Sequence, residues 1–195
     1  SIALCAHRLD QMEELRRAVE MSSCVTAVFL ESSHSTNSAY DAILEGALAL
    51  IEADQATLFI WDQDLQMLEG VASRGARSGD ELGLRFRSGE GIVGWVFGAR
   101  EPRWTLNVQE DAAYQARRSG IKSLLSVPLQ TIKGGVLGVL NISRLDDRHA
   151  FNDAEIALAS TFAHRAAHAL QDAEERAGRR LPEPGRPAGP RAEAA

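Results

Sequence analysis

The sequence has few cysteines, no long hydrophobic run and no excess of basic residues. Only two of its 195 residues are cysteines, Cys5 and Cys24, and both lie in the N-terminal segment. Their spacing fits neither a disulfide framework nor a zinc site, which indicates reduced thiols in a cytosolic protein. No stretch approaches the roughly 18 consecutive apolar residues of a membrane span, and the N-terminus lacks a signal-peptide pattern. We therefore expect a cytoplasmic protein without a membrane partner.

The charge balance argues against nucleic acid as a partner. The formal net charge is −6, so there is no overall attraction to nucleic acid or to anionic lipid. The basic pairs Arg117-Arg118 and Arg179-Arg180 are isolated and form no stripe. Hydrophobic residues make up 45% of the chain, which is enough for one globular core with extensions.

The N-terminal segment, residues 1–31, is predicted to be a helix. Its apolar positions alternate at spacings of three and four, an imperfect heptad pattern. The β-branched residues within 24–30 leave a short strand there as an alternative. A polar loop follows, in which Asn37 or Ser38 is predicted to cap the next helix, with Asp41 in its first turn.

The middle of the chain predicts two pairs of antiparallel strands. Residues 56–61 and 66–73 flank a turn and read as a hairpin. Residues 102–108 form a short extended piece, and 111–118 a polar helical turn. Residues 122–132 and 136–142 form the second pair, in which Pro128 suggests a bulge or an edge. The order of elements predicts an α+β domain with an antiparallel sheet and not a stack of parallel βαβ units.

A regular apolar seam marks the last helix, predicted over residues 152–176. Its members recur at alternating spacings of three and four: Ile156, Ala159, Ala163, Ala166, Leu170, Ala173 and Ala177. Such a seam either docks on the domain's own sheet or pairs with a partner helix, and we favour the partner because the N-terminal helix offers a second seam. Residues 178–195 hold four of the six prolines and are predicted to be a disordered tail.

Residues 89–94 spell G-x-G-x-x-G, the fingerprint of a dinucleotide site. That fingerprint requires a buried strand before it and a long helix after it. Here the preceding residues 82–88 are short and charged, and Gly98 and Pro102 limit the following helix to about two turns. We therefore interpret the glycines as backbone devices: Gly89 turns the chain, and Gly94 lets the helix sit close to the sheet.

Three stretches together resemble the GAF family of sensory domains. They are residues 54–62, residues 89–97 with Glu101-Pro102 and Asn107-Val108, and residues 123–129 with 135–142 and 151–155. The resemblance runs in order from about residue 37 to residue 170. It implies a GAF domain over residues 37–177 with a PAS-like α+β fold: a central antiparallel sheet of five to six strands, flanking helices, and long N- and C-terminal helices.

The resemblance also implies a ligand pocket between one sheet face and the short helices and loops that cross it. It places eight residues near that pocket: Phe59, Arg74, Ile92, Trp95, Asn107, Tyr114, Ser126 and Asn141. Arg74 would meet an anionic ligand or lie solvated on the surface. Tyr114 would stack on a base or pack half-buried. Trp95 and Phe97 should face opposite sides of their helix, with one of them packed inward.

The known ligand classes of the family match only in part. The cyclic-nucleotide subset carries an Asn-Lys, Phe, Asp-Glu pattern, whereas here Ile142 follows Asn141, and Ala154 precedes Glu155. Phe151 and Glu155 fit an ordinary helix entry equally well. A bilin needs a pocket cysteine, and residues 25–195 contain none; haem-binding relatives use a histidine where residues 109–126 contain none. The cofactor therefore stays unknown.

Catalysis and metal binding have little support in the sequence. His164 and His168 are four apart on a helix, but Arg165 follows the first, so the H-E-x-x-H pattern is absent. The enzymatic branch of the family reduces free methionine sulfoxide with pocket cysteines, which are missing here. We predict no catalytic residue and no metal ligand.

The resulting hypothesis is a cytoplasmic, non-enzymatic sensory domain, expected to be a homodimer. A small molecule would bind over the sheet, and the terminal helices would relay the signal to a separate effector such as a kinase, a cyclase or a transcription factor. One alternative is a ligand-free GAF scaffold for dimerisation or protein interaction. Another is an enzyme like the free methionine sulfoxide reductases.

Overall fold

The computed structural model describes residues 36–76, 78–106, 108, 120–146 and 150–176, with positions 12, 16, 17, 19–23 and 26. Those N-terminal positions are helical. The rest of the predicted N-terminal helix, the polar helical turn at 111–118 and the predicted tail at 178–195 lie outside the described residues. Within the described part of the chain, no helix combines the length and the apolar character that a membrane crossing requires.

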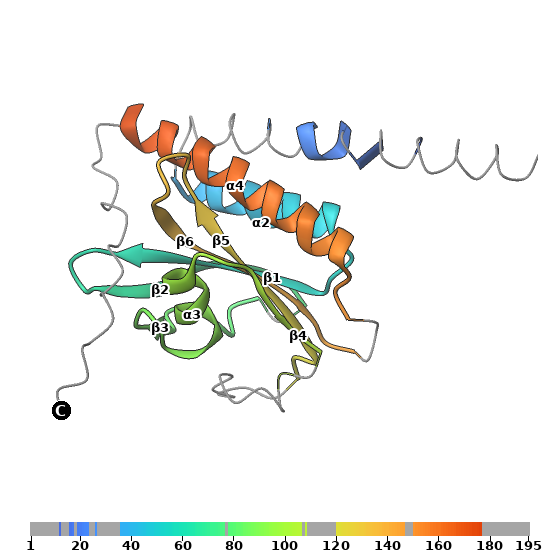
Figure 1. Ribbon diagram of the computed structural model, residues 1–195, viewed down its shortest axis with the longest axis horizontal. Helices are drawn as coiled ribbons and strands as arrows, with labels where there is room; N and C mark the ends of the chain where they lie inside the picture. The colour runs from blue at the N-terminus through green and yellow to red at the C-terminus, as the bar shows by residue number, and fades with distance from the viewer. Residues whose placement is uncertain are drawn as a thin grey trace, which may run out of the picture.

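The described elements form one six-stranded antiparallel sheet with helices on both faces (Figure 1). The strand order is β3-β2-β1-β6-β5-β4. In chain order the elements are α2 (Thr36–Leu50), β1 (Gln55–Asp62), β2 (Met67–Gly75), β3 (Arg85–Phe86), α3 (Gly91–Ala99), β4 (Arg103–Thr105), β5 (Ser123–Gln130), β6 (Val136–Arg144) and α4 (Asp153–Arg176). The predicted α+β class and antiparallel sheet are confirmed.

Both predicted strand pairs are present. β1 pairs with β2 and β5 pairs with β6, while β1 and β6 join the two hairpins at the centre of the sheet. β4 pairs only with residues 124–126 of β5. Pro128 therefore lies beyond the stretch that β4 covers, and the register shifts between Leu129 and Gln130 directly after it. The missing N–H of proline accounts for this position.

The second predicted helix begins earlier than expected. α2 starts at Thr36, so Asn37 and Ser38 lie inside its first turn and do not cap it, and Asp41 is outside that turn. Several consecutive Ser, Thr and Asn residues offer alternative caps, so the sequence alone leaves this helix start undetermined.

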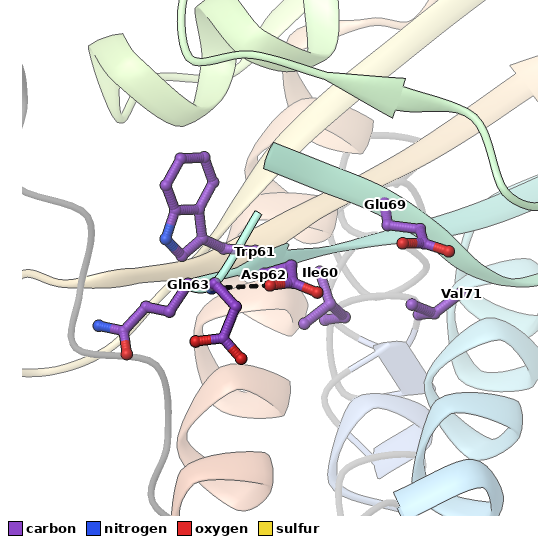
Figure 2. Close-up of a pocket in the computed structure, with 7 residues that line it drawn as sticks. Ile60, Trp61, Asp62, Gln63, Glu69 and Val71 are labelled. Atoms are coloured by element: carbon purple, nitrogen blue, oxygen red, sulfur yellow. Dashed lines mark hydrogen bonds between the residues drawn. The ribbon is translucent and has the colours of Figure 1, made fainter. Parts of the chain in front are cut away.

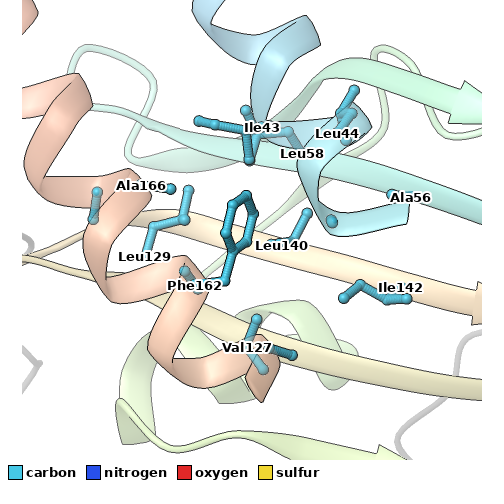
Figure 3. Close-up of a cluster of buried hydrophobic side chains, with 14 of the residues drawn as sticks. Ile43, Leu44, Ala56, Leu58, Val127, Leu129, Leu140, Ile142, Phe162 and Ala166 are labelled. Atoms are coloured by element: carbon cyan, nitrogen blue, oxygen red, sulfur yellow. The ribbon is translucent and has the colours of Figure 1, made fainter. Parts of the chain in front are cut away.

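α2 and α4 cover one face of the sheet, which we call the helix face (Figure 3). Phe162 is 1% exposed and lies between α4 and the strands, among Val127, Leu129 and Leu140. The alanine seam belongs to this core: Ile156, Ala159, Ala163, Ala166 and Leu170 are all buried against the chain's own sheet and α2. Our preference for a partner helix on this seam was therefore wrong over those residues. Ala173 and Ala177 lie outside the described side chains.

The entry to α4 is held by reciprocal hydrogen bonds. The backbone N–H of Glu155 donates to Asn152 Oδ1 at 2.9 Å, and the N–H of Asn152 donates to a Glu155 carboxylate oxygen at 3.0 Å, which is a capping box. Arg144, 4% exposed, bonds the other oxygen of Glu155 at 2.5 Å and the Glu52 carbonyl at 2.8 Å. Its guanidinium also lies 4.2 Å from the centre of the Phe151 ring. Phe151 and Glu155 thus serve helix entry.

Among the described helices of the domain, α3 lies on the opposite face of the sheet, which we call the α3 face (Figure 1). It is a helix of nine residues, and the sheet is antiparallel, so residues 89–94 have neither the parallel crossover nor the long helix of a dinucleotide site. Gly94 permits a close approach, but to the preceding turn: a Cβ there would lie 2.1 Å from the carbonyl oxygen of Arg87. Gly94 is therefore needed for the contact with the Arg87 backbone and not, as we predicted, for a contact with the sheet.

Candidate functional site

One half of the α3 face is filled by the protein's own aromatic side chains. Trp61 and Phe97 are stacked with ring centroids 4.6 Å apart, and Phe59 meets Phe86 edge-on at 5.6 Å. Ile92 of α3 is buried in the same cluster. Aromatic packing of this kind stabilises the attachment of α3 to the sheet and leaves this half of the face apolar.

A row of polar residues also crosses the α3 face. Thr57 of β1 lies opposite Ser73 of β2 on one side and opposite Asn141 of β6 on the other, and Asn141 lies opposite Ser126 of β5. These four residues form a row across four strands, which we call the polar row. Ser126 donates to Asn141 Oδ1 at 2.6 Å, and the hydroxyls of Thr57 and Ser73 are 3.0 Å apart.

The polar row lies on the α3 face because side chains alternate along a strand. Thr57 is two residues from Phe59, Asn141 two from Val139 and Ser126 two from Leu124, and these three apolar residues pack in the cluster that contains α3. Thr57, Ser126 and Asn141 are at most 2% exposed. The row is therefore a set of buried hydrogen-bonding groups in the middle of the sheet.

Glu81, in the loop between β2 and β3, adds a carboxylate to one end of the row. Its Oε2 accepts hydrogen bonds from the Thr57 hydroxyl at 2.5 Å and from Gln55 Nε2 at 3.2 Å. The loop reaches this position by crossing Gly70, where a Cβ would lie 2.2 Å from the Glu81 carbonyl oxygen. Glycine at position 70 is thus what allows the carboxylate to approach the sheet.

Two atoms next to the row have no hydrogen-bond partner within the described part of the chain. They are Gln55 Oε1 and Ser143 Oγ, on residues that are each 1% exposed and directly opposite each other on β1 and β6. A buried polar atom without a partner costs about 1–3 kcal/mol. Such atoms usually bind a water molecule or a ligand.

Four of the eight residues predicted to line the pocket share the α3 face. Phe59 and Ile92 lie in its apolar half, and Ser126 and Asn141 form half of the polar row. Asn107 and Tyr114 lie outside the described residues, so their predicted roles stay predictions.

Arg74 does not join this group. It lies opposite Ala56 on the helix face and forms an ion pair with Glu45 of α2. The cause is a bulge in β2: Phe59 pairs with Gly70 and Leu58 with Ala72, which leaves Val71 unpaired. One extra residue moves every later side chain of the strand to the other face. The expected contact of Arg74 with a pocket ligand therefore has no geometric basis.

Trp95 points away from the sheet. It is 36% exposed, and the Arg103 guanidinium lies 5.2 Å from its ring centre. Phe97 is the inward residue of the predicted pair, stacked on Trp61. Trp95 thus lines the outer surface of α3.

Sequence reasoning missed most of the polar groups on the α3 face. The missed residues are Gln55, Thr57, Ser73, Glu81 and Ser143. A signal was present, because polar residues alternate with apolar ones in strands that are otherwise buried: Gln55 and Thr57 flank Ala56, and Asn141 and Ser143 flank Ile142.

A separate hollow of about 420 Å³ lies at the end of the β1–β2 hairpin (Figure 2). It is lined by Ile60, Trp61, Asp62, Gln63, Asp64, Glu69 and Val71. Two of its three carboxylates have structural partners: Asp62 accepts the N–H groups of Asp64 and Leu65 at 2.8 and 2.9 Å, and Glu69 pairs with Arg85 at 3.0 Å. None of the eight predicted residues lines this hollow.

The described residues include no group of three or more His, Cys, Asp and Glu side chains that could hold a metal ion. His164 is exposed on α4, and His168 Nδ1 lies 3.3 Å from a carboxylate oxygen of Asp172 in the same helix. The two histidines therefore sit on the outer surface of α4, away from the polar row.

Comparison with known proteins agrees with this architecture. The fold matches the GAF domain of a phosphoenolpyruvate-protein phosphotransferase from Coxiella burnetii with a TM-score of 0.68 and 24% identity, covering 83% of this chain and 98% of that one. It matches the GAF-B domain of DevS from Mycobacterium smegmatis with a TM-score of 0.60 and 22% identity, covering 71% and 95%. It also matches the reduced form of fRMsr from Staphylococcus aureus with a TM-score of 0.64 and 16% identity, covering 79% and 94%.

Among curated proteins no match was found. The family model of the GAF domain matches residues 33–171, well over half of the chain. The chain therefore belongs to the GAF domain family.

Proposed function

We propose that this chain is a cytoplasmic sensory GAF domain that binds a small molecule on the α3 face, over the polar row. The observation that carries the proposal is the buried row itself, with the partnerless Gln55 Oε1 and Ser143 Oγ beside it. These two buried oxygens need hydrogen-bonding partners, and a bound small molecule supplies them. Ser126, Asn141 and Thr57 would orient the ligand, and the aromatic half of the face would hold its apolar part.

The relay would run through the sheet to α4. Ser126 faces the proposed ligand, while its neighbours Leu125 and Val127 point to the helix face and pack in the cluster that contains α4. A ligand that shifts β5 therefore changes the surface on which α4 sits. The Arg144–Glu155 pair couples the end of β6 to the start of the same helix. We propose that α4 passes this change to a separate effector protein, such as a kinase, a cyclase or a transcription factor.

We further propose that the sensor acts as a homodimer, but through a surface other than the alanine seam, because that seam is buried within the chain. The exposed side of α4 carries Ala157, Thr161, His164 and Arg165, and it is available to a second copy.

The ligand-free scaffold remains the second candidate, since the aromatic packing of Phe59, Trp61 and Phe97 closes half of the α3 face without any ligand. Catalysis of the free methionine sulfoxide reductase type has less support. Residues 25–195 contain no cysteine, so no member of the polar row or its flanking pair is a thiol. We therefore propose a domain without enzymatic activity.

A ligand screen read by thermal unfolding tests the proposal. Cyclic mono- and dinucleotides, amino acids, 2-oxoglutarate and haem are compared on wild type and on the double variant Ser126→Ala, Asn141→Leu. The double variant replaces both partners of one hydrogen bond with apolar groups. The free energy of unfolding should therefore change little. A compound that raises the Tm of wild type but not of the double variant supports the sensor. If every compound leaves the wild-type Tm unchanged, the scaffold becomes the better account.

A further inference from the structure

The two partnerless atoms beside the polar row also define which chemical group a ligand brings to them. Gln55 Oε1 accepts hydrogen bonds and cannot donate. The amide cannot be turned to change this, because its Nε2 donates to the Glu81 carboxylate at 3.2 Å, and a turned amide would set one oxygen against another. The missing partner of Gln55 is therefore a donor.

Ser143 is the cross-strand neighbour of Gln55 on the same face. Gln55 and Ser143 are directly opposite each other in the β1–β6 register and point to the same face. The Cβ atoms of such a pair are about 4.5–5.5 Å apart, so the two side chains leave the sheet from neighbouring positions.

The local charge disfavours an anion at this position. Glu81 is one hydrogen bond away from Gln55 and also accepts the Thr57 hydroxyl. Among the described residues of the polar row and its flanking pair, none is basic, and Arg74 lies on the helix face. A phosphate or carboxylate here would face a carboxylate and an amide oxygen.

We propose that the ligand places an N–H-bearing nitrogen, a primary amine or a primary amide, between Gln55 Oε1 and Ser143 Oγ. This rests on the proposed function and adds the chemical class of the ligand's buried end. The nitrogen donates one hydrogen bond to each of the two oxygens. The nearby Glu81 carboxylate attracts the positive charge of an amine or the partial positive charge of an amide N–H group.

The chain offers a matched control. Ser123 Oγ is also buried and partnerless within the described residues, but Ser123 lies opposite Arg144 on the helix face. Replacing either serine with alanine removes an unsatisfied buried hydroxyl, so both variants should have a raised Tm without ligand. Only Ser143→Ala removes a group from the proposed nitrogen site.

The experiment is a titration followed by NMR of the amide groups, with glycinamide, ethanolamine and acetamide as donor probes. Acetate and inorganic phosphate are the anionic probes. We expect the donor probes to shift the Gln55 side-chain amide and the backbone signal of Ser143 in wild type and in Ser123→Ala. Ser143→Ala should weaken their affinity about tenfold, whereas the anions should leave these signals unchanged.

Three outcomes would overturn the inference. If acetate or phosphate binds at Gln55 more tightly than the donor probes, or if donor affinity is the same in Ser143→Ala, the chemical class is wrong while the proposed function stands. If no probe and no compound of the ligand screen shifts any α3-face signal, the proposed function fails and the inference fails with it.

Discussion

The Arg144–Glu155 pair gives the sharpest quantitative prediction. Glu155 fills two roles, because one carboxylate oxygen caps α4 through the Asn152 N–H and the other bonds the buried Arg144. Glu155→Gln separates them: glutamine preserves a capping box but removes the negative charge. The guanidinium, whose side chain is only 5% exposed, then loses the negative charge of Glu155 in a poorly hydrated site.

Removing one partner of a buried ion pair costs about 3–5 kcal/mol. The Glu155 side chain is 21% exposed, so we take the lower end, about 3 kcal/mol. At about 2–4 °C per kcal/mol for a domain of this size, the expected fall in Tm is roughly 6–12 °C. The control is Asp153→Asn in the same helical turn. Asp153 is exposed, and its negative charge stabilises the N-terminus of α4 by about 0.3–1 kcal/mol.

Thermal and urea unfolding of four proteins complete the assay: wild type, Glu155→Gln, Arg144→Met and the double variant. The double variant should lose less stability than the sum of the single ones, with a coupling of about 1–3 kcal/mol, because it leaves no unpaired buried charge. A Glu155→Gln loss no greater than that of Asp153→Asn would refute the reasoning, and so would strict additivity in the cycle.

Three further predictions concern packing. Phe97→Ala should cost about 3–5 kcal/mol and change the fluorescence of Trp61, because it removes the stacked ring; chemical unfolding and fluorescence measure both. Gly70→Ala should cost about 3 kcal/mol and displace Glu81, since its Cβ meets the loop backbone; unfolding and amide exchange of residues 79–83 report this. Ala166→Glu should unfold the domain by circular dichroism rather than release a folded monomer, because Ala166 is 0% exposed in the core.

Each variant has a control at a less crowded or more exposed position. Trp95→Ala on the outer side of α3 should cost less free energy of unfolding than Phe97→Ala. Gly98→Ala should cost less than Gly70→Ala, and Ala157→Glu on the exposed side of α4 less than Ala166→Glu. If light scattering instead finds that Ala166→Glu is a folded monomer, the alanine seam is a subunit interface and its assignment to the core is wrong. If Trp95→Ala and Phe97→Ala lower the free energy of unfolding equally, the inward and outward faces assigned to α3 are wrong.

Much of the fold could be predicted because it depends on short-range patterns. The β1–β2 and β5–β6 pairs follow from runs of β-branched and apolar residues around turns, and α4 follows from its periodic seam. The family resemblance predicted the sheet that joins them. The surface that covers the seam could not be predicted, because periodicity shows that a helix has an apolar face and does not say what lies against it.

The candidate site was predictable only in part, for a similar reason. Ser126 and Asn141 lie together on the α3 face, whereas Arg74 lies on the helix face, because the bulge at Val71 reverses the alternation within β2. Trp95 points outward, and this could not be read from the sequence because α3 is apolar on nearly all sides, so its pattern does not choose an inward face. Glu81 depends on the contact of a loop with Gly70, which no local pattern records.

A crystal structure of the protein with the tightest binder from the ligand screen tests the central claim most directly. The account predicts the binder on the α3 face, over Thr57, Asn141 and Ser126, with an N–H group within hydrogen-bond distance of Gln55 Oε1 and Ser143 Oγ. A structure in which protein groups satisfy both of these oxygens and the binder sits elsewhere would contradict it.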